Sequence, residues 1–106
     1  MDNKEKELFK LKAQVIQALA HPARLAIVDF LKDGPQCVCK IAELFESDRS
    51  NISKHLSLMT KAGILDSRKE GLYIYYSLKI LCVVKFLGCV EDALKEIGRA
   101  SCRERV

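Results

Sequence analysis

The chain has 106 residues, of which 49% are hydrophobic and 30% are charged, and its formal net charge is +4 at pH 7. That length fits one domain, and the hydrophobic share is enough for one core. No apolar run reaches the roughly 18 residues of a membrane-spanning helix, and no secretory leader precedes the mixed charges at the start. We therefore expect a cytoplasmic protein with no membrane partner. The positive balance permits nucleic-acid binding but does not by itself indicate it.

The cysteine count and the last residues bear on what belongs to the domain. Five cysteines are an odd number, which argues against a closed disulfide framework and for thiols that are kept reduced. Residues 96–106 read EIGRASCRERV, and no apolar periodicity continues into them. Back-translated with suitable codons, they reproduce a widely used sequencing-library adapter. We therefore expect a domain over residues 1–95 and a non-native tail over residues 96–106, which contains Cys102.

Two helices are predicted in the first third of the chain. Apolar residues from Leu8 to Leu19 recur at helical spacing with lysines between them, which indicates an amphipathic helix. His21 interrupts this pattern, and Pro22 suits the first position of a second helix because its missing N–H would have no partner there. Gly34 can cap that second helix, and the proline after it prevents continuation.

A helix-turn-helix is predicted next. A short third helix is expected from about Cys39 to Glu46, and Ser47 and Asp48 offer a capping oxygen for a fourth helix that runs to about Ala62. The fourth helix has one apolar face and one small, polar and basic face. The apolar stripe consists of Ile52, Leu56 and Met59.

The period then changes to that of strands. Residues 64–69 and 72–78 can form two strands around a turn at Glu70 and Gly71, and a last helix restores helical spacing from Ile80 to Leu94. The order is therefore α-α-α-α-β-β-α, a mainly α fold with a β-hairpin (α+β). Two short helices joined by a tight turn and followed by a hairpin describe a winged helix-turn-helix.

The fourth helix carries the side-chain types that read DNA. Arginine and asparagine can make bidentate contacts with base edges, and serine and lysine suit phosphates. The expected DNA-binding residues of this helix are Arg49, Ser50, Asn51, Ser53, Lys54 and His55. His55 can equally be a partly buried structural histidine, and the whole face can be simply solvated.

The hairpin adds a second candidate DNA contact. We place Arg68 and Lys69 at its tip, where a wing can touch phosphate or the minor groove. Charged hairpin tips are also common without any partner, so this position alone does not indicate DNA.

Four cysteines are candidate metal ligands. Cys37 and Cys39 stand two residues apart at a helix start, where the chain is still extended and both thiols can point the same way. The positive end of the helix dipole favours thiolates there. Cys82 and Cys89 lie two helical turns apart on one face, roughly 10 Å along the axis, so either could complete a site begun elsewhere. Any of the four can instead be a small core residue.

Together these segments resemble the ArsR/SmtB family of metal-responsive repressors. The resemblance covers about residues 8 to 80 and rests on ALAHPARLAIVDFLKDG, QCVCKIAEL, SDRSNISKHLSLMTKAGIL and SRKEGLYIYYSL. It implies a homodimer held by the first and last helices. It also implies a repressor that leaves its double-stranded operator DNA when metal binds.

The cysteine pattern of the family is matched only in part. Arsenic-responsive members typically carry CVCxxC in the third helix; Cys37 and Cys39 match its first two positions, whereas Ala42 holds the third. Cys82 or Cys89, of the same or the partner subunit, could supply the third thiolate. Zinc-sensing members of the family carry histidine ligands on the last helix. This chain lacks them, because no histidine follows His55. Soft thiolates favour As(III) and Sb(III), or cadmium and lead, as the effector.

Three other functions compete with this hypothesis. A redox-responsive regulator would oxidise the same cysteines, and the sequence does not distinguish it from a metal sensor. A winged-helix protein-interaction module without DNA binding would show apolar residues on the outer face of the fourth helix. An enzyme is the least favoured, because the sequence shows no Ser-His-Asp set, phosphate loop or paired carboxylate.

Overall fold

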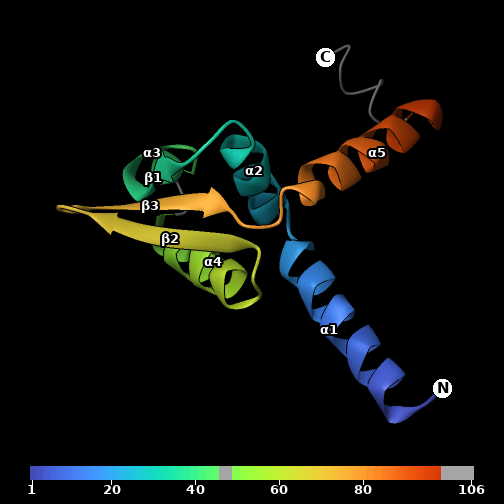
Figure 1. Cartoon of the computed structure of the whole chain (residues 1–106). Helices are drawn as coiled ribbons and strands as arrows, with labels where there is room; N and C mark the ends of the chain where they lie inside the picture. Colours follow the sequence, from blue (N-terminus) through green and yellow to red (C-terminus); the bar gives the residue numbers. More distant parts are fainter. Residues whose placement is uncertain (46–48, 99–106) are drawn as a thin grey trace.

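The computed structural model describes residues 1–45 and 49–98, with only the backbone described at positions 49 and 50. Five helices and three strands lie in this part of the chain (Figure 1). In chain order they are α1 (Asn3–Leu19), α2 (Pro22–Leu31), β1 (Gln36–Cys37), α3 (Val38–Glu43), α4 (Arg49–Lys61), β2 (Leu65–Glu70), β3 (Tyr73–Leu78) and α5 (Cys82–Glu96). The predicted order is confirmed with one addition, the strand β1, which has two residues and is too short to leave a periodicity in the sequence.

Side-chain caps fix where the first three helices begin. The Asp2 Oδ1 accepts a hydrogen bond from the Glu5 N–H at 2.8 Å, and the His21 Nδ1 accepts one from the Ala23 N–H at 3.0 Å. Pro22 occupies the first position of α2, as predicted. At α3 the cap is Cys37, whose sulfur accepts from the Cys39 N–H at 3.3 Å. Helix α3 therefore starts at Val38, one residue before the predicted start.

The sheet has the strand order β1-β3-β2, and both pairings are antiparallel. In the hairpin, Leu65 lies opposite Leu78 and Glu70 lies opposite Tyr73. The turn therefore consists of Gly71 and Leu72, one residue later than predicted. Gly71 has a φ of 62°, which suits the first central position of a tight two-residue hairpin turn. Arg68 and Lys69 consequently lie on β2 behind the turn, and their predicted place at the tip is wrong.

The core lies where α2, α3 and α4 meet the hairpin. The predicted stripe of α4 is confirmed, because Ile52, Leu56 and Met59 are all buried, whereas the neighbouring Leu58 is 43% exposed. The same core takes in the following side chains from the other elements: Ala18, Leu19, Ile27, Val28, Leu31, Ile41, Ile64, Leu65, Leu78 and Val83. One face of α4 is thereby fixed against the core, and the opposite face is left outside.

The first and last helices contribute little to this core. Only the last turn of α1 is buried, at Ala18 and Leu19, and only Val83 of α5 is buried. Figure 1 shows both helices extending away from the other elements in different directions. Large apolar side chains remain exposed on them, at Leu8, Phe9, Leu11, Ile16, Phe86 and Val90. Within the described residues, none of the helices is sufficiently long and apolar to cross a membrane.

Candidate nucleic-acid interface and cysteine pair

The outer face of α4 is polar, basic and exposed. Asn51, Ser53 and Lys54 all lie on it, as predicted from the sequence. A shallow hollow on this face is lined by Ser53, Lys54, Ser57, Leu58 and Lys61. Among the described side chains of α4, Lys54 and Lys61 are cationic and none is a carboxylate, so the outer face of the helix is positive. The backbone of Arg49 and Ser50 forms the first turn of α4, and their predicted roles rest on that position alone.

His55 lies on the flank of α4, between the buried stripe and the outer face. Its side chain is half-buried, and its ring centroid is 4.6 Å from that of His21, with the two planes tilted by 50°. Because His21 caps α2, this contact connects the start of α2 to the middle of α4. His55 therefore has a contact inside the domain, and its role in DNA binding stays a prediction.

The hairpin carries exposed cations behind an apolar tip. The Arg68 Nη2 lies 2.6 Å from the Glu70 Oε1, and both side chains are largely exposed. Exposed pairs of this kind contribute little free energy, so Arg68 can exchange Glu70 for a phosphate at small cost. Lys69 is exposed on the same strand, and Leu72, at the turn, is 94% exposed. The exposure of Leu72 depends on the turn register, which no periodicity along the chain indicates.

Cys37 and Cys39 bring their sulfurs together at the junction of β1 and α3. The Cys39 thiol donates to the Cys37 sulfur, and the two sulfurs are 2.6 Å apart. Cys37 is buried and Cys39 is exposed. The expectation that both thiols point the same way is confirmed, since Cys37 is extended at the cap whereas Cys39 already belongs to the helix.

The two thiols differ in acidity. The hydrogen bond from Cys39 lowers the pKa of Cys37 below its usual value, the backbone N–H groups of Cys39 and Lys40 lower it further, and burial opposes them. The same thiol–thiol bond raises the pKa of Cys39. The bond between the two thiols therefore favours loss of a proton from Cys37 over loss of a proton from Cys39.

Cys82 and Cys89 do not meet this pair within the chain. Both are exposed on α5, which Figure 1 shows on the opposite side of the molecule from α3. Within residues 1–45 and 49–98, no group of three or more His, Cys, Asp or Glu side chains lies close enough to hold one metal ion. The pair by itself offers two sulfur ligands, so a three-sulfur site would need a ligand from elsewhere. Cys102 lies outside the described residues.

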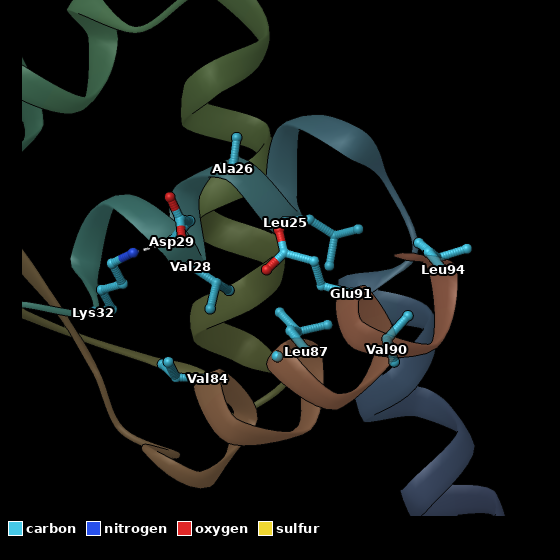
Figure 2. A pocket seen from close by; sticks show the side chains of 11 residues that line it. Leu25, Ala26, Val28, Asp29, Lys32, Val84, Leu87, Val90, Glu91 and Leu94 are labelled. Atoms are coloured by element: carbon cyan, nitrogen blue, oxygen red, sulfur yellow. Dashed lines mark hydrogen bonds and ion pairs between the residues drawn. The ribbon is translucent and has the colours of Figure 1, made fainter. Parts of the chain in front are cut away.

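An apolar groove of about 600 Å³ separates α2 from α5 (Figure 2). Its apolar walls are Leu25, Ala26 and Val28 on one side and Val84, Leu87, Val90 and Leu94 on the other. Asp29, Lys32 and Glu91 line its polar edge. The Lys32 Nζ is 3.1 Å from the Asp29 Oδ1, and this contact raises the pKa of Lys32. The groove is open to solvent in the single chain.

Comparison with known proteins assigns the family. Residues 21–67 match the family described as bacterial regulatory protein, arsR family. An uncharacterized HTH-type transcriptional regulator of Methanocaldococcus jannaschii is 35% identical over 92 residues, which are 86% of this chain and 91% of that relative. The chain belongs to the ArsR family.

Two further relatives bear on the fold of this ArsR-family chain. The arsenical resistance operon repressor of Bacillus subtilis is 34% identical over 79 residues, which are 74% of this chain and 75% of that repressor. The solution NMR structure of a homodimeric winged helix-turn-helix DNA-binding domain from Mycobacterium bovis is similar with a TM-score of 0.77 at 27% identity, over 91% of this chain and 89% of that domain. The predicted winged helix-turn-helix fold is thereby confirmed, with β2 and β3 as the wing.

The asymmetry of the thiol pair can be measured by titration. In a protein whose other three cysteines are alanine, we expect Cys39→Ala to raise the pKa of Cys37, because the S–H donor is removed. We expect Cys37→Ala to lower the pKa of Cys39, because the bond that holds its proton is removed. Ultraviolet thiolate absorbance followed against pH gives both values, with the intact pair read as two macroscopic steps. Unchanged midpoints in both variants would contradict the bond.

Proposed function

We propose that the chain is a transcriptional repressor that binds operator DNA as a homodimer and is released by a thiophilic ion at Cys37 and Cys39. Its relatives are transcriptional regulators, which supports a regulatory and non-enzymatic role. The observation that carries the DNA-binding part is the position of α4, which is anchored by a buried stripe and turns a polar, basic face outward. A cytoplasmic location and the non-native origin of residues 96–106 remain part of the proposal.

The face of α4 has the chemistry that a major groove requires. The amide of Asn51 can pair with an adenine edge, while Lys54 can neutralise a phosphate. A protein-interaction surface would bury large apolar groups, and on this face Leu58 is an isolated exposed leucine among Ser53, Ser57 and lysines. The composition of the face therefore favours DNA over a protein partner.

Two substitutions separate base reading from phosphate contact. The probe is a duplex selected from a random-sequence library by the unaltered chain. We expect Asn51→Ala to weaken binding by about 1–3 kcal/mol and to change the base preference, because a bidentate contact is lost. We expect Lys54→Ala to weaken binding to all duplexes and to reduce the salt slope by about one. Fluorescence anisotropy over a range of salt concentrations measures both.

Lys79→Ala is the matched control for charge, because Lys79 is an exposed lysine between β3 and α5. It should leave base preference and salt slope unchanged. Unaltered affinity in a folded, dimeric Asn51→Ala, Lys54→Ala double variant would rule out this face.

A dimer follows from the unpartnered helices and from DNA geometry. One recognition helix reads one half-site, so a two-fold dimer is the simplest way to read a whole operator. The exposed apolar side chains of α1 match the open groove between α2 and α5 in character. The lysines of α1 also complement Asp29 and Glu91 at the groove edge. The similar domain from M. bovis is described as homodimeric, which supports the same assembly here.

A charge placed in the groove tests the dimer. Val90 lines the groove and is 42% exposed, and Val90→Glu would place a carboxylate among the apolar side chains that the second chain has to cover. We expect the dimer dissociation constant to rise by more than about tenfold in sedimentation equilibrium. Leu44→Glu, at a side chain that is 45% exposed at the end of α3, should leave it unchanged. A Val90→Glu protein that dimerises as tightly as the unaltered chain would contradict the proposed interface.

The position of Cys37 explains how an ion could reach the DNA-binding unit. Its sulfur caps α3, and its backbone pairs with Tyr75 of the wing. A sulfur drawn toward an ion can no longer cap α3 in the same way, so both the helix-turn-helix and the wing are displaced together. Release requires an ion that binds the non-operator conformation better, and couplings of roughly 1–3 kcal/mol are typical.

The choice of ion rests on ligand chemistry. Two adjoining sulfurs favour soft acceptors, first As(III) and Sb(III) and then cadmium and lead. One relative is named an arsenical resistance operon repressor, which supports the first choice. Within the described residues of one chain, neither Cys82 nor Cys89 joins the pair in a three-ligand group. We therefore propose that a third thiolate comes from the partner subunit, with Cys82 as the first candidate and Cys89 as the second.

The sensing site is tested by release of the selected duplex. We expect Cys37→Ser and Cys39→Ser proteins to bind it normally but to remain bound when arsenite is added, because each lacks one thiolate. Cadmium, lead, zinc and peroxide are titrated in parallel by anisotropy, and Cys102→Ser serves as the cysteine control that keeps the response. Normal release in the Cys37→Ser, Cys39→Ser double variant would end the metal-site proposal. Release of the unaltered chain by peroxide alone would favour the redox alternative, for which the adjoining sulfurs are equally suited.

A further inference from the structure

The tip of the wing is apolar and lies outside the core. Leu72 is 94% exposed, and the two residues after it, Tyr73 and Ile74, are 55% and 40% exposed. Strand β1 pairs with β3 at Tyr75 and Tyr76, and beyond them the ribbon consists of β2 and β3 alone in the part of the chain that the structure describes. Figure 1 shows this end of the hairpin projecting past β1.

Folding does not account for a leucine at this position. The turn requires a positive φ at Gly71, whereas the second central position accepts most residues, and polar ones predominate in turns. Leu72 also contributes nothing to the buried cluster. Together with Tyr73 and Ile74, Leu72 forms a contiguous exposed apolar patch at the end of a protruding turn, and patches of this kind mark contacts made outside the chain.

The charges near the tip indicate what kind of partner it meets. Lys69 and Arg68 follow directly behind it on β2, paired across the ribbon with Ile74 and Tyr75. Within β2 and β3, the carboxylate nearest the turn is Glu70, and Arg68 holds it in an exposed pair. An apolar tip backed by cations matches proteins that place aliphatic wedges in the minor groove of DNA while their basic residues contact the flanking phosphates.

The wing is also placed to reach the same duplex as α4. Helix α4 packs against β2, and Figure 1 shows it alongside the hairpin, so the two elements form one body. If α4 occupies a major groove, the projecting ribbon extends along the duplex toward the neighbouring backbone and minor groove.

We propose that Leu72 enters the minor groove beside the half-site and partly unstacks a base step there. This inference rests on the proposed function, since it requires that α4 binds DNA. Unstacking is least costly at flexible pyrimidine–purine steps. Leu72 therefore gives the protein a preference for such a step, although the leucine side chain makes no hydrogen bond to a base.

The test uses the full chain and the duplex that it selects. The fluorescent base aminopurine is placed in turn at each position flanking the half-site, where unstacking raises its emission. We expect the unaltered chain to raise emission at one flanking step and Leu72→Ala to abolish that rise. Affinity should fall about tenfold in Leu72→Ala, because the burial of one leucine side chain is lost. Leu72→Met, which keeps the apolar bulk, should retain both effects.

Salt dependence separates this role from an electrostatic one. Leu72→Ala removes no charge, so its salt slope should equal that of the unaltered chain, whereas Lys69→Gln should lower the slope by about one and keep the rise in emission. Because Leu72 is exposed, the alanine variant should fold normally.

Each negative result has a distinct meaning. Unaltered affinity and emission in Leu72→Ala would overturn the minor-groove inference while leaving the proposed function intact. If Leu72→Ala weakens the dimer in sedimentation, and this weakening accounts for the whole loss of DNA affinity, the tip makes a protein contact. That result would also overturn the minor-groove inference. If the unaltered chain selects no duplex and binds none, the proposed function itself fails.

Discussion

Burial of one face of α4 against the core sets the orientation of this helix, and the wing is positioned by the same contacts. Ile52, Leu56 and Met59 are held against α2 and the hairpin, and each is at most 2% exposed. Since a helix cannot rotate about its axis without exposing such a stripe, the polar face of α4 has one orientation. The same packing places β2 beside α4, so the wing and the polar face of α4 are fixed relative to each other. The proposed DNA-binding surface therefore follows from the packing of an ordinary core.

Cys37 connects the proposed sensing site to the helix-turn-helix and to the wing. Its sulfur does the work that serine or aspartate usually does at a helix start, and its backbone belongs to the sheet that carries the wing. A weak acceptor such as sulfur makes a weak cap, so the start of α3 is a place where a competing interaction can win. The pKa of Cys37 is lowered at the same position, chiefly by the S–H donor of Cys39. The Cys37 sulfur therefore has two roles, as the cap of α3 and as a ligand of the proposed ion.

The first and last helices, α1 and α5, are packed far less than α4 and bury only a few side chains. Leu8, Leu11, Ile16, Phe86 and Val90 on these helices lie exposed, outside the buried core of the described residues, and the groove between α2 and α5 is open. A chain this short buries a limited share of its surface, and association is a common way to cover the remainder. The exposed cysteines of α5 lie on the same helix, so a dimer would decide what surrounds them. The proposed third ligand is therefore a question about the assembly and not about the fold.

The order of the helices and strands was predictable from the residues alone, because helical and strand periodicities are local and every element of four residues or more leaves one. The stripe of α4 was predictable from spacing along that helix, and the adjacency of the two thiols from their place at a helix start, where the extended chain turns into the helix. The register of the hairpin depends on pairing between segments, and it places the turn at Gly71 and Leu72 with Arg68 and Lys69 behind it. Likewise, the pairing of β1 with β3 and the contact of His55 with His21 join residues far apart in the chain. Cys82 and Cys89 are separated from Cys37 for the same reason: distances between elements are set by packing, to which no periodicity along the chain corresponds.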